Sequence, residues 1–462
     1  MYYLADSLYQ LDTLIKLLGT PSGVFLAAVI VAMFLCSFGR PGRWVVLTTL
    51  LFTSTLSFGV EALRNPLIPP FEQVRFAAEP LVYTFAAFLA LPSFLAPSTH
   101  LRTPLLAATF AFWIFEMIYS LHMAVSVDLQ RGLLSMAIFT TYLISFGFGM
   151  PRWIRGIADV HTAARCMGTA AFLFILGTTA QVIVNRHAII FSNRLYAITG
   201  NPQHAAFILA IVLLPICVLI ASKREAIPMR FFWATVAGAD IAMLIWTGSR
   251  TGTLTALVGL ALLFRRRIGT FVGVGLIALI FVFFFLALFQ PDAATGSRIL
   301  SLQDTRTGVW ASLFEKFQAN PFFGTMSKTD YTAAESSYLT VAAHMGLLGL
   351  GLVGIVVCFL AGALRRGGRL RSTLQSEDDL ILVDWVSAGL IAIFVGAFFE
   401  GVLVATLNLM LVSVYFYLGL LKYISDKNTL AMAVYQPPME LPGNATDYAQ
   451  APGRFVELPR AL

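Results

Sequence analysis

Charged residues are scarce in this chain. Of its 462 residues, 12% are charged and 58% are hydrophobic, whereas soluble proteins carry about 25% charged residues. Apolar runs of around 20 residues recur along the whole length, and each is long enough to cross the hydrocarbon core as a helix. The composition therefore excludes an ordinary soluble protein and predicts an all-α, polytopic bundle of transmembrane helices.

Cysteine is also scarce. A cleavable signal is likewise not expected from the start of the sequence. The four cysteines lie in or beside apolar runs, at Cys36, Cys166, Cys217 and Cys358. This placement excludes a disulfide framework and metal-ligand spacing. The first 20 residues have no basic start and no small-residue cleavage site. An apolar stripe from Leu4 to Leu18 predicts instead a helix lying on the membrane surface.

The apolar runs predict thirteen spans, or twelve if one weak segment does not cross. They are expected at residues 22–38, 44–63, 78–97, 104–124, 132–150, 168–184, 203–222, 231–249, 251–264, 268–289, 337–363, 380–400 and 402–421. Internal repeats and paired broken helices of the transporter kind are not evident. Their absence makes a transporter less expected.

Loop charge predicts the orientation. One set of alternate loops holds 18 of the 31 basic residues, among them Arg265, Arg266, Arg267 and Lys422. The positive-inside rule places this set in the cytoplasm. The net charge of +7 is therefore explained by membrane topology and does not indicate nucleic-acid binding. We expect a multi-pass protein of a bacterial inner membrane. The chain is predicted to have four parts. These are a transmembrane bundle at 1–290, a periplasmic loop at 291–336, three transmembrane spans at 337–425, and a disordered cytoplasmic tail at 426–462.

The chain is organised around one long polar segment, from Gln290 to Ser337. Loops of this length are usually functional or disordered. Within it, the sequence predicts a short amphipathic helix. Its apolar face is formed by Val309, Trp310, Leu313, Phe314 and Phe317, which recur at helical spacing. Asp304 or Thr305 is a suitable start, and Asn320-Pro321 a suitable stop. We interpret the segment as a lid over a membrane cavity; the alternative is a solvated loop with one interfacial helix.

Arg250 is the most informative single position. It lies in a tight outward hairpin, Thr247-Gly248-Ser249-Arg250. The following run, 251–264, rises only about 21 Å at 1.5 Å per residue, less than the hydrocarbon thickness of about 30 Å. The hairpin is therefore expected below the outer surface, where a guanidinium requires water or an anion. Snorkelling towards lipid headgroups is the alternative.

Other outward segments add candidate binding residues. Arg194 precedes a Gly-Asn-Pro turn in which Asn201 is suited to cap the next span. Arg306 and Trp310 share a face of the loop helix. The long segment also holds Arg298, and Glu400 lies in a later outward hairpin that we expect to border the same cavity as Arg250.

Four further side chains have an expected role. Glu335, at the end of the long loop, fits two interpretations: a general base at the lip of the cavity, or a favourable charge at the start of the next helix. Glu116, Asp240 and His344 lie within predicted spans. Intramembrane ionisable groups are functional candidates, and Asp240 with Glu116 would form the relay of a transporter. A structural, hydrogen-bonded carboxylate is the favoured alternative.

These motifs resemble the O-antigen ligase/polymerase superfamily of bacterial envelope enzymes over residues 190–360. The resemblance includes the Ser-Arg hairpin, the Arg194 loop, and Arg306-x-x-x-Trp310 followed by Asn320-Pro321-x-x-Gly324. It continues with Tyr338-Leu339 and with Gly346-Leu347-Leu348-Gly349-Leu350. Each motif is short, and their shared order carries the match.

The resemblance implies metal-independent, cofactor-free glycosyl transfer from an undecaprenyl-diphosphate-linked glycan to a glycan or lipid acceptor, with inversion. Arg194 and Arg250 would hold the diphosphate, with Arg306 helping. Arg298, Trp310, Asn201, Tyr338 and Glu400 are further substrate-binding candidates. Ligases of the family usually carry His-Asn before x-Tyr-Leu, where this chain has Glu335-Ser336. We therefore expect a polymerase of O-antigen or exopolysaccharide repeats, with Glu335 activating the acceptor.

Three alternatives stay open: an O-antigen ligase, a secondary transporter or flippase that uses Asp240 and Glu116, and a non-catalytic partner in an export complex. Partners expected besides the substrates and the bilayer are chain-length regulators or export proteins, and no nucleic acid.

Overall fold

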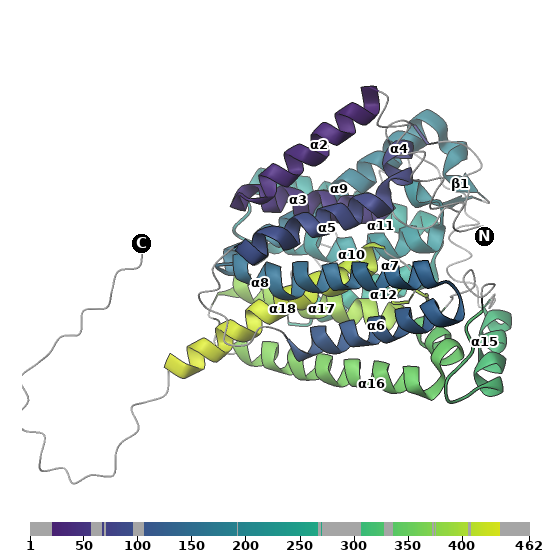
Figure 1. Ribbon diagram of the computed structural model, residues 1–462. Helices are drawn as coiled ribbons and strands as arrows, with labels where there is room; N and C mark the ends of the chain where they lie inside the picture. Colours follow the sequence, from purple (N-terminus) through teal and green to yellow (C-terminus); the bar gives the residue numbers. More distant parts are fainter. Residues whose placement is uncertain are drawn as a thin grey trace, which may run out of the picture.

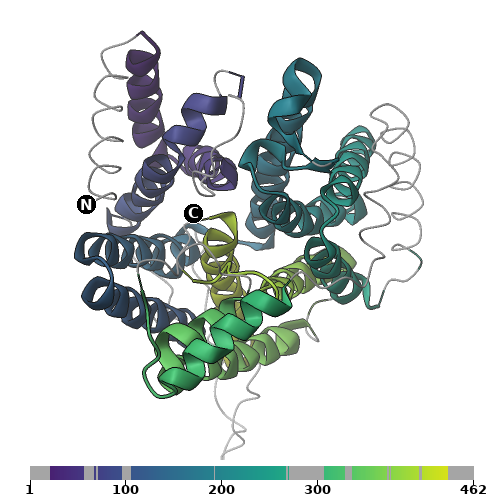
Figure 2. The same ribbon diagram turned by 90° about the vertical axis from the view of Figure 1, so that its right-hand side faces the viewer.

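The computed structural model describes residues 21–56, 67–68, 71–95, 106–191, 193–266, 269, 306–327, 336–371, 374, 376–404 and 408–434. These residues are predominantly α-helical, which confirms the predicted all-α bundle. The axes of the long helices are roughly aligned, and β1 and α15 lie at one end of the bundle (Figure 1). Figure 2 shows this end from the front, with α15, in green, lying across it.

The described elements follow one another in this order: α2 (Pro21–Ser37), α3 (Arg40–Leu56), α4 (Phe71–Phe76), α5 (Ala78–Leu95), α6 (Ala107–Ser126), α7 (Leu129–Tyr142), the π-helix η1 (Leu143–Gly149), α8 (Met150–Trp153), α9 (Ile157–Asn185), the 3-10 helix η2 (Arg186–Ala188), β1 (Ile190–Phe191), β2 (Arg194–Leu195), the 3-10 helix η3 (Ala197–Thr199), α10 (Pro202–Ala221), α11 (Ile227–Thr247), α12 (Arg250–Phe264), α15 (Thr307–Ala319), α16 (Ser337–Arg371), α17 (Glu377–Gly396) and α18 (Leu409–Val434).

Helices occupy twelve of the thirteen predicted spans, and the remaining one, 268–289, lies outside the described residues. Seven helical stretches are long and apolar enough to cross a membrane, and shorter apolar helices occur within α2, α5, α12 and α18. The chain is therefore a multi-pass membrane protein. The predicted surface helix at 4–18 also lies outside the described residues.

Several predicted boundaries differ from the structure. α9 begins at Ile157, well before the expected start at 168, and takes in residues assigned to a loop. α18 begins at Leu409, not 402, and continues to Val434, past the expected start of the tail at 426. Lys422, assigned to a cytoplasmic loop, is consequently buried within α18. Polar residues inside long helices account for the earlier start of α9 and the later end of α18, because hydropathy marks the apolar part of a helix and not its hydrogen-bonded ends.

Side-chain caps fix where several helices begin. The Asn201 side chain accepts hydrogen bonds from the backbone N–H groups of Gln203 and His204, and Pro202 follows as the first helical residue of α10. Ser249 caps α12 by accepting from Gly252 N–H. Asn408 accepts from the N–H groups of Met410 and Leu411 at the start of α18. Of these three caps, the sequence predicted Asn201, which pairs a polar side chain with the apolar run that follows it.

α10 is the centre of one half of the bundle. Nearly all of its residues from Ala205 to Ile220 are buried, and it packs against α9, α11, α12 and α17. Close approach to α12 depends on Gly252, because a Cβ there would lie 2.5 Å from the Cβ of Ala206. The end of α11 and the starts of α10 and α12 consequently meet at the same end of the bundle.

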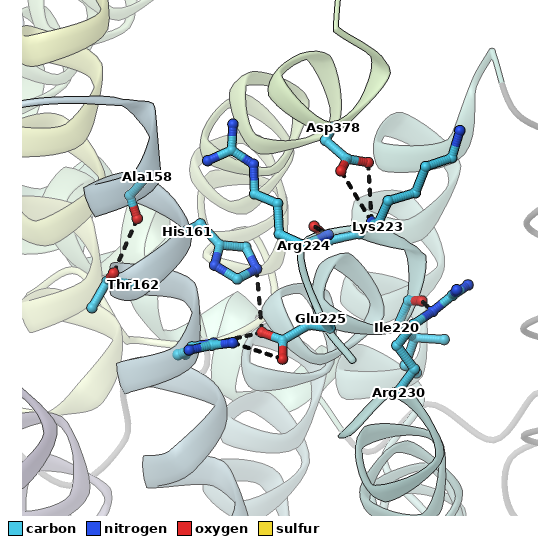
Figure 3. Close-up of polar contacts among 11 residues, drawn as sticks. Ala158, His161, Thr162, Ile220, Lys223, Arg224, Glu225, Arg230 and Asp378 are labelled. Atoms are coloured by element: carbon cyan, nitrogen blue, oxygen red, sulfur yellow. Dashed lines mark hydrogen bonds and ion pairs between the residues drawn. The ribbon is translucent and has the colours of Figure 1, made fainter. Parts of the chain in front are cut away.

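The other end of α10 and α11 carries a cluster of ion pairs (Figure 3). The buried Glu225 carboxylate accepts two hydrogen bonds from Arg165, at 2.5 and 2.9 Å, and His161 Nε2 lies 3.2 Å from it. Arg224 pairs with Asp379 at 2.5 Å, which ties the same loop to the start of α17. Charged groups thus hold the helix ends together where apolar packing stops.

Candidate functional site

One cavity brings together the arginines that the sequence singled out. It has a volume of about 330 Å³, at the lower end of the roughly 300–1,000 Å³ typical of small-molecule sites. We call it the arginine cavity, and it is lined by Arg194, Gln203, Gly248, Ser249, Arg250, Thr251, Leu254, Arg306, Trp310 and Phe399. Three separate regions of the chain therefore contribute a guanidinium group to one space.

Arg194 enters the cavity from a small β-hairpin. β1 and β2 pair Ile190 with Leu195 and Phe191 with Arg194, and Asn193 adopts a positive φ of 59° in the turn. Leu195 is fully buried, which anchors the hairpin in the bundle. Arg194 Nε donates a 2.7 Å hydrogen bond to the carbonyl oxygen of Thr247. The guanidinium is thereby fixed against the last residue of α11.

Arg250 lies directly across the same turn. α11 ends at Thr247, Gly248 follows with a φ of 62°, and Ser249 caps the start of α12. A positive φ suits glycine because it has no Cβ. Arg250 is exposed at the first residue of α12 and lines the cavity. The hairpin predicted from the sequence is therefore present, and it places Arg250 beside the carbonyl that holds Arg194.

Arg306 reaches the cavity from the long polar segment. One terminal nitrogen, Nη2, donates to Glu400 Oε1 at 2.5 Å, and Nη1 donates to the carbonyl oxygen of Phe399. Both partners belong to the turn between α17 and α18. The Trp310 and Phe399 rings lie 6.4 Å apart, one helical turn further along α15. Glu400 therefore positions Arg306 and does not itself line the cavity.

α15 begins and ends close to its predicted limits. The helix starts at Thr307, with Arg306 in the cap position, and Asn320 ends it as predicted. Asp304 and Thr305, the expected caps, lie outside the described residues. Leu313 is buried, but Phe314, predicted on the same face, is 50% exposed. The five side chains were predicted only to share one face, and 3.6-residue periodicity places position 314 at the edge of that stripe.

The residues after α15 are bonded into a break in α16. Gly346 interrupts α16 with a φ of 62° and a ψ of −150°. The N–H groups of Leu347 and Leu348 donate to the carbonyl oxygens of Pro321 and Phe322, at 2.7 and 3.3 Å. Thr325 N–H donates to the carbonyl of Ala343 at 2.8 Å. The Asn-Pro-x-x-Gly and Gly-Leu-Leu-Gly motifs are thus two halves of one backbone junction.

Two further candidates lie outside the lining of the arginine cavity. The Asn201 side chain is engaged in capping α10. Tyr338 donates a 2.9 Å hydrogen bond to the carbonyl of Phe394 and lines a small apolar pocket with Phe112 and Phe115. Glu335 and Arg298, the candidate base and a candidate ligand, lie outside the described residues.

Sequence reasoning missed Gln203, Leu254 and Phe399, which also line the cavity. Gln203 comes two residues after the capping Asn201, and this position in the first turn was a usable signal. Phe399 had none, because a carbonyl that accepts from an arginine 93 residues away leaves no trace in local sequence.

The arrangement favours an anion. Three guanidinium groups and the Glu400 carboxylate sum to two positive charges, and the start of α12 adds the positive end of a helix dipole. Arginine keeps its charge and binds phosphate through paired hydrogen bonds. The buried indole Nε1 of Trp310 has no hydrogen-bond partner within the described part of the chain, which adds a donor beside the lining.

The three intramembrane candidates lie away from this cavity's lining. Glu116 and Asp240 are fully buried, and their carboxyl oxygens have no hydrogen-bond partner among the described residues. Glu116 lies on α6, which packs mainly on α7 and α16, while Asp240 lies on α11, which packs mainly on α10. The Tyr119 hydroxyl lies 2.8 Å from His344 Nδ1. Among the described residues, no three His, Cys, Asp or Glu side chains gather to hold a metal ion.

Comparison with known proteins gives little at the level of sequence. No protein-family model matches the chain, and no curated protein matches it. Among solved structures, a chain of a peptidoglycan synthase complex, reported for the coordination of polymerization and crosslinking, is similar at 14% identity and a TM-score of 0.41. The match covers 71% of this chain and 98% of that one. At this degree of similarity, the argument about function depends on the arginine cavity.

Proposed function

We propose that this protein is a membrane glycosyl transfer enzyme that moves a glycan from a polyprenyl-diphosphate carrier to an acceptor hydroxyl and so lengthens a polysaccharide. The single observation that carries the proposal is the meeting of Arg194, Arg250 and Arg306 in one cavity. The cavity adjoins apolar helices, so it is suited to a ligand with a charged head and a lipid tail. The carrier named by the family resemblance, undecaprenyl diphosphate, has this chemistry.

The proposed reaction is a displacement at the anomeric carbon of the carrier-linked sugar. The acceptor oxygen forms a bond to that carbon, the bond from the carbon to the phosphate oxygen breaks, and the configuration inverts. The acceptor proton passes to a base, for which Glu335 is our candidate, and the lipid diphosphate leaves with the electron pair. Negative charge grows on the leaving group, so preorganised arginines lower the barrier.

Each arginine has a distinct part in this proposal. Arg194 and Arg250 flank the end of α11, where they would grip the diphosphate from two directions. Arg306 arrives from the segment that covers the cavity, so it would bind the same group once α15 is docked. Trp310 offers a flat apolar face and an indole N–H for a sugar ring.

Chain extension by the purified protein tests the proposal. The protein, in lipid nanodiscs, is incubated with an undecaprenyl-diphosphate oligosaccharide, and products are separated by length. We expect longer chains from the unchanged protein, and a loss of about 10²–10³-fold in rate for Arg250→Ala, the size seen when one donor to a developing anion is removed. Arg194→Ala should lose at least as much, because its removal also frees the Thr247 carbonyl.

Lys223→Ala is the matched control. Its side chain is also cationic and exposed, but it lies at the opposite end of α10 and points away from its neighbours (Figure 3). The variant should extend chains at the normal rate. Normal extension by both Arg194→Ala and Arg250→Ala would end the proposal.

The acceptor separates a polymerase from a ligase. Glu335-Ser336 in place of the ligases' His-Asn favours transfer to another carrier-linked glycan. Supplying that glycan and a lipid A-core acceptor in parallel distinguishes the two, and we expect product only from the glycan. Product only from the lipid acceptor would make the protein an O-antigen ligase.

A second function, proton-coupled transport or flipping, draws on a different observation. Glu116 and Asp240 are buried, with carboxyl oxygens that lack hydrogen-bond partners among the described residues. That function predicts translocation of a carrier-linked glycan that is lost in Asp240→Asn and retained in Arg306→Ala. The opposite pattern favours the enzyme.

A further inference from the structure

An exposed apolar patch lies beside α15, outside the arginine cavity. Phe322 and Phe323 are 66% and 67% exposed, and Leu347 and Leu348 are each 49% exposed. We call these four residues the Phe322 patch. Two adjacent phenylalanines that are this exposed at the end of a loop helix would be costly in water, and such patches mark a contact surface.

The patch is part of one fixed structure. Backbone hydrogen bonds from Leu347 and Leu348 to Pro321 and Phe322 bring the four side chains to the same junction. Close packing there depends on Gly346, because a Cβ at that position would lie 2.5 Å from the backbone of Phe322. The two phenylalanines therefore keep a constant position relative to α16.

The environment of α16 changes at this junction. From Thr340 to Gly346 the residues are buried in the protein, whereas many after Gly346 are exposed, among them Ile355 and Phe359. Only 22% of the apolar stretch of α16 is buried, and the helix lies at the edge of the bundle (Figure 1). An apolar face of this kind belongs in lipid.

The length of α16 places the membrane boundary. The stretch from Leu347 to Leu364, which ends just before Arg365 and Arg366, rises about 26 Å at 1.5 Å per residue. The hydrocarbon core is about 30 Å thick. If Arg365 and Arg366 lie at one surface of the membrane, Leu347 and the phenylalanines held at the same junction lie at the opposite surface. The part of α16 before Gly346 then lies at the level of the headgroups and beyond.

We propose that the Phe322 patch is a membrane anchor, in which Phe322 and Phe323 insert into the bilayer at the end of the bundle that carries α15. The occupant is lipid, because the patch continues the lipid-facing surface of α16. The exposed Phe314, on α15, extends the same apolar character. The inference does not depend on the proposed function, because it uses none of the cavity residues.

Nitroxide accessibility tests the anchor. Single cysteines at Phe323, Val357 and Gln318 are introduced after replacement of the four native cysteines, spin-labelled, and placed in phosphatidylcholine nanodiscs. All three positions are in the described residues and exposed. Oxygen concentrates in lipid and a nickel chelate in water, so their collision rates report where each label lies. Val357, in the middle of α16, is the lipid control, and Gln318, on α15, is the water control.

We expect the label at 323 to meet oxygen more often than the nickel chelate, as at 357 and unlike 318. A nickel accessibility equal to that at 318 would place the patch in water and overturn the proposal. Low accessibility to both reagents would mean that protein covers the patch, from a second copy or another partner, and would overturn it equally. Quenching by lipids nitroxide-labelled at different depths, measured on a fluorescent label at 323, gives an independent estimate of position.

Discussion

Arg306 and Glu400 form an ion pair of 2.5 Å between residues 94 positions apart in sequence. Both side chains are largely shielded from solvent, with 14% and 5% of their surfaces exposed. The pair joins the segment that carries α15 to the turn between α17 and α18. It therefore helps to hold the third arginine at the cavity, together with the hydrogen bond from Arg306 to the Phe399 carbonyl.

Replacing Glu400 should release this contact. Glu400→Gln keeps the shape of the side chain but removes its charge, which weakens a charge-assisted hydrogen bond of about 1.5–3 kcal/mol. We expect faster amide hydrogen exchange throughout α15 and chain extension reduced about tenfold. Glu377→Gln, a carboxylate at the other end of α17, is the control. Unchanged exchange in Glu400→Gln would show that α15 stays docked without the Glu400 charge.

Gly346 should tolerate no side chain. Its φ of 62° and ψ of −150° lie in a region that is essentially restricted to glycine and costs another residue about 1–3 kcal/mol. An added Cβ would also meet the backbone of Phe322 at 2.5 Å. Gly346→Ala should therefore lower the unfolding temperature measured in detergent micelles. Gly351→Ala, in the same helix with open space around its Cβ, should leave it unchanged or raise it. Equal unfolding temperatures in the two variants would contradict the junction.

Asn201 can be assigned to capping or to substrate binding. Asn201→Ala removes the side-chain acceptor and should cost about 0.5–2 kcal/mol of stability. Asn201→Asp keeps the acceptor, so its unfolding temperature should match that of the unchanged protein. An added carboxylate that touched a diphosphate would repel it. If Asn201→Asp unfolds normally but no longer extends chains, Asn201 binds substrate; normal extension assigns it to the cap.

Replacing Glu225 should change the stability of the protein without changing its rate of chain extension. Glu225→Ala leaves Arg165 and His161 without their shared carboxylate and should cost about 1–3 kcal/mol, because Glu225 is buried although Arg165 is half exposed. The cluster lies a full length of α10 from the cavity. Chain extension per folded molecule should therefore stay normal while the unfolding temperature falls. A loss of rate in the folded fraction would indicate that the two ends of the bundle are coupled.

Local signals in the sequence predicted the fold well. Apolar runs located twelve described helices, and caps such as Asn201 and Asn320 marked helix limits, because these signals act within a few residues. The family resemblance implied that Arg194 and Arg250 hold one diphosphate, so the two loops were expected to share a hollow. The structure brings the two side chains to one cavity.

Contacts between distant segments could not be predicted. The pairing of Pro321 with Leu347 depends on backbone groups that every residue carries. The Phe399 carbonyl was missed for the same reason: hydrogen bonding by the backbone is independent of residue type. The exposure of Phe314 could not be predicted either, because periodicity shows which residues share a face and not how deeply each one is buried.

The turn that holds Arg306 is made after all three arginines of the cavity. A ribosome inserts Arg194 and Arg250 into the membrane long before residues 399 and 400 emerge, and domains assemble as their parts appear. Until α17 is complete, α15 has no carboxylate to receive its arginine. A nascent or truncated chain consequently lacks the contact that holds the third arginine at the cavity.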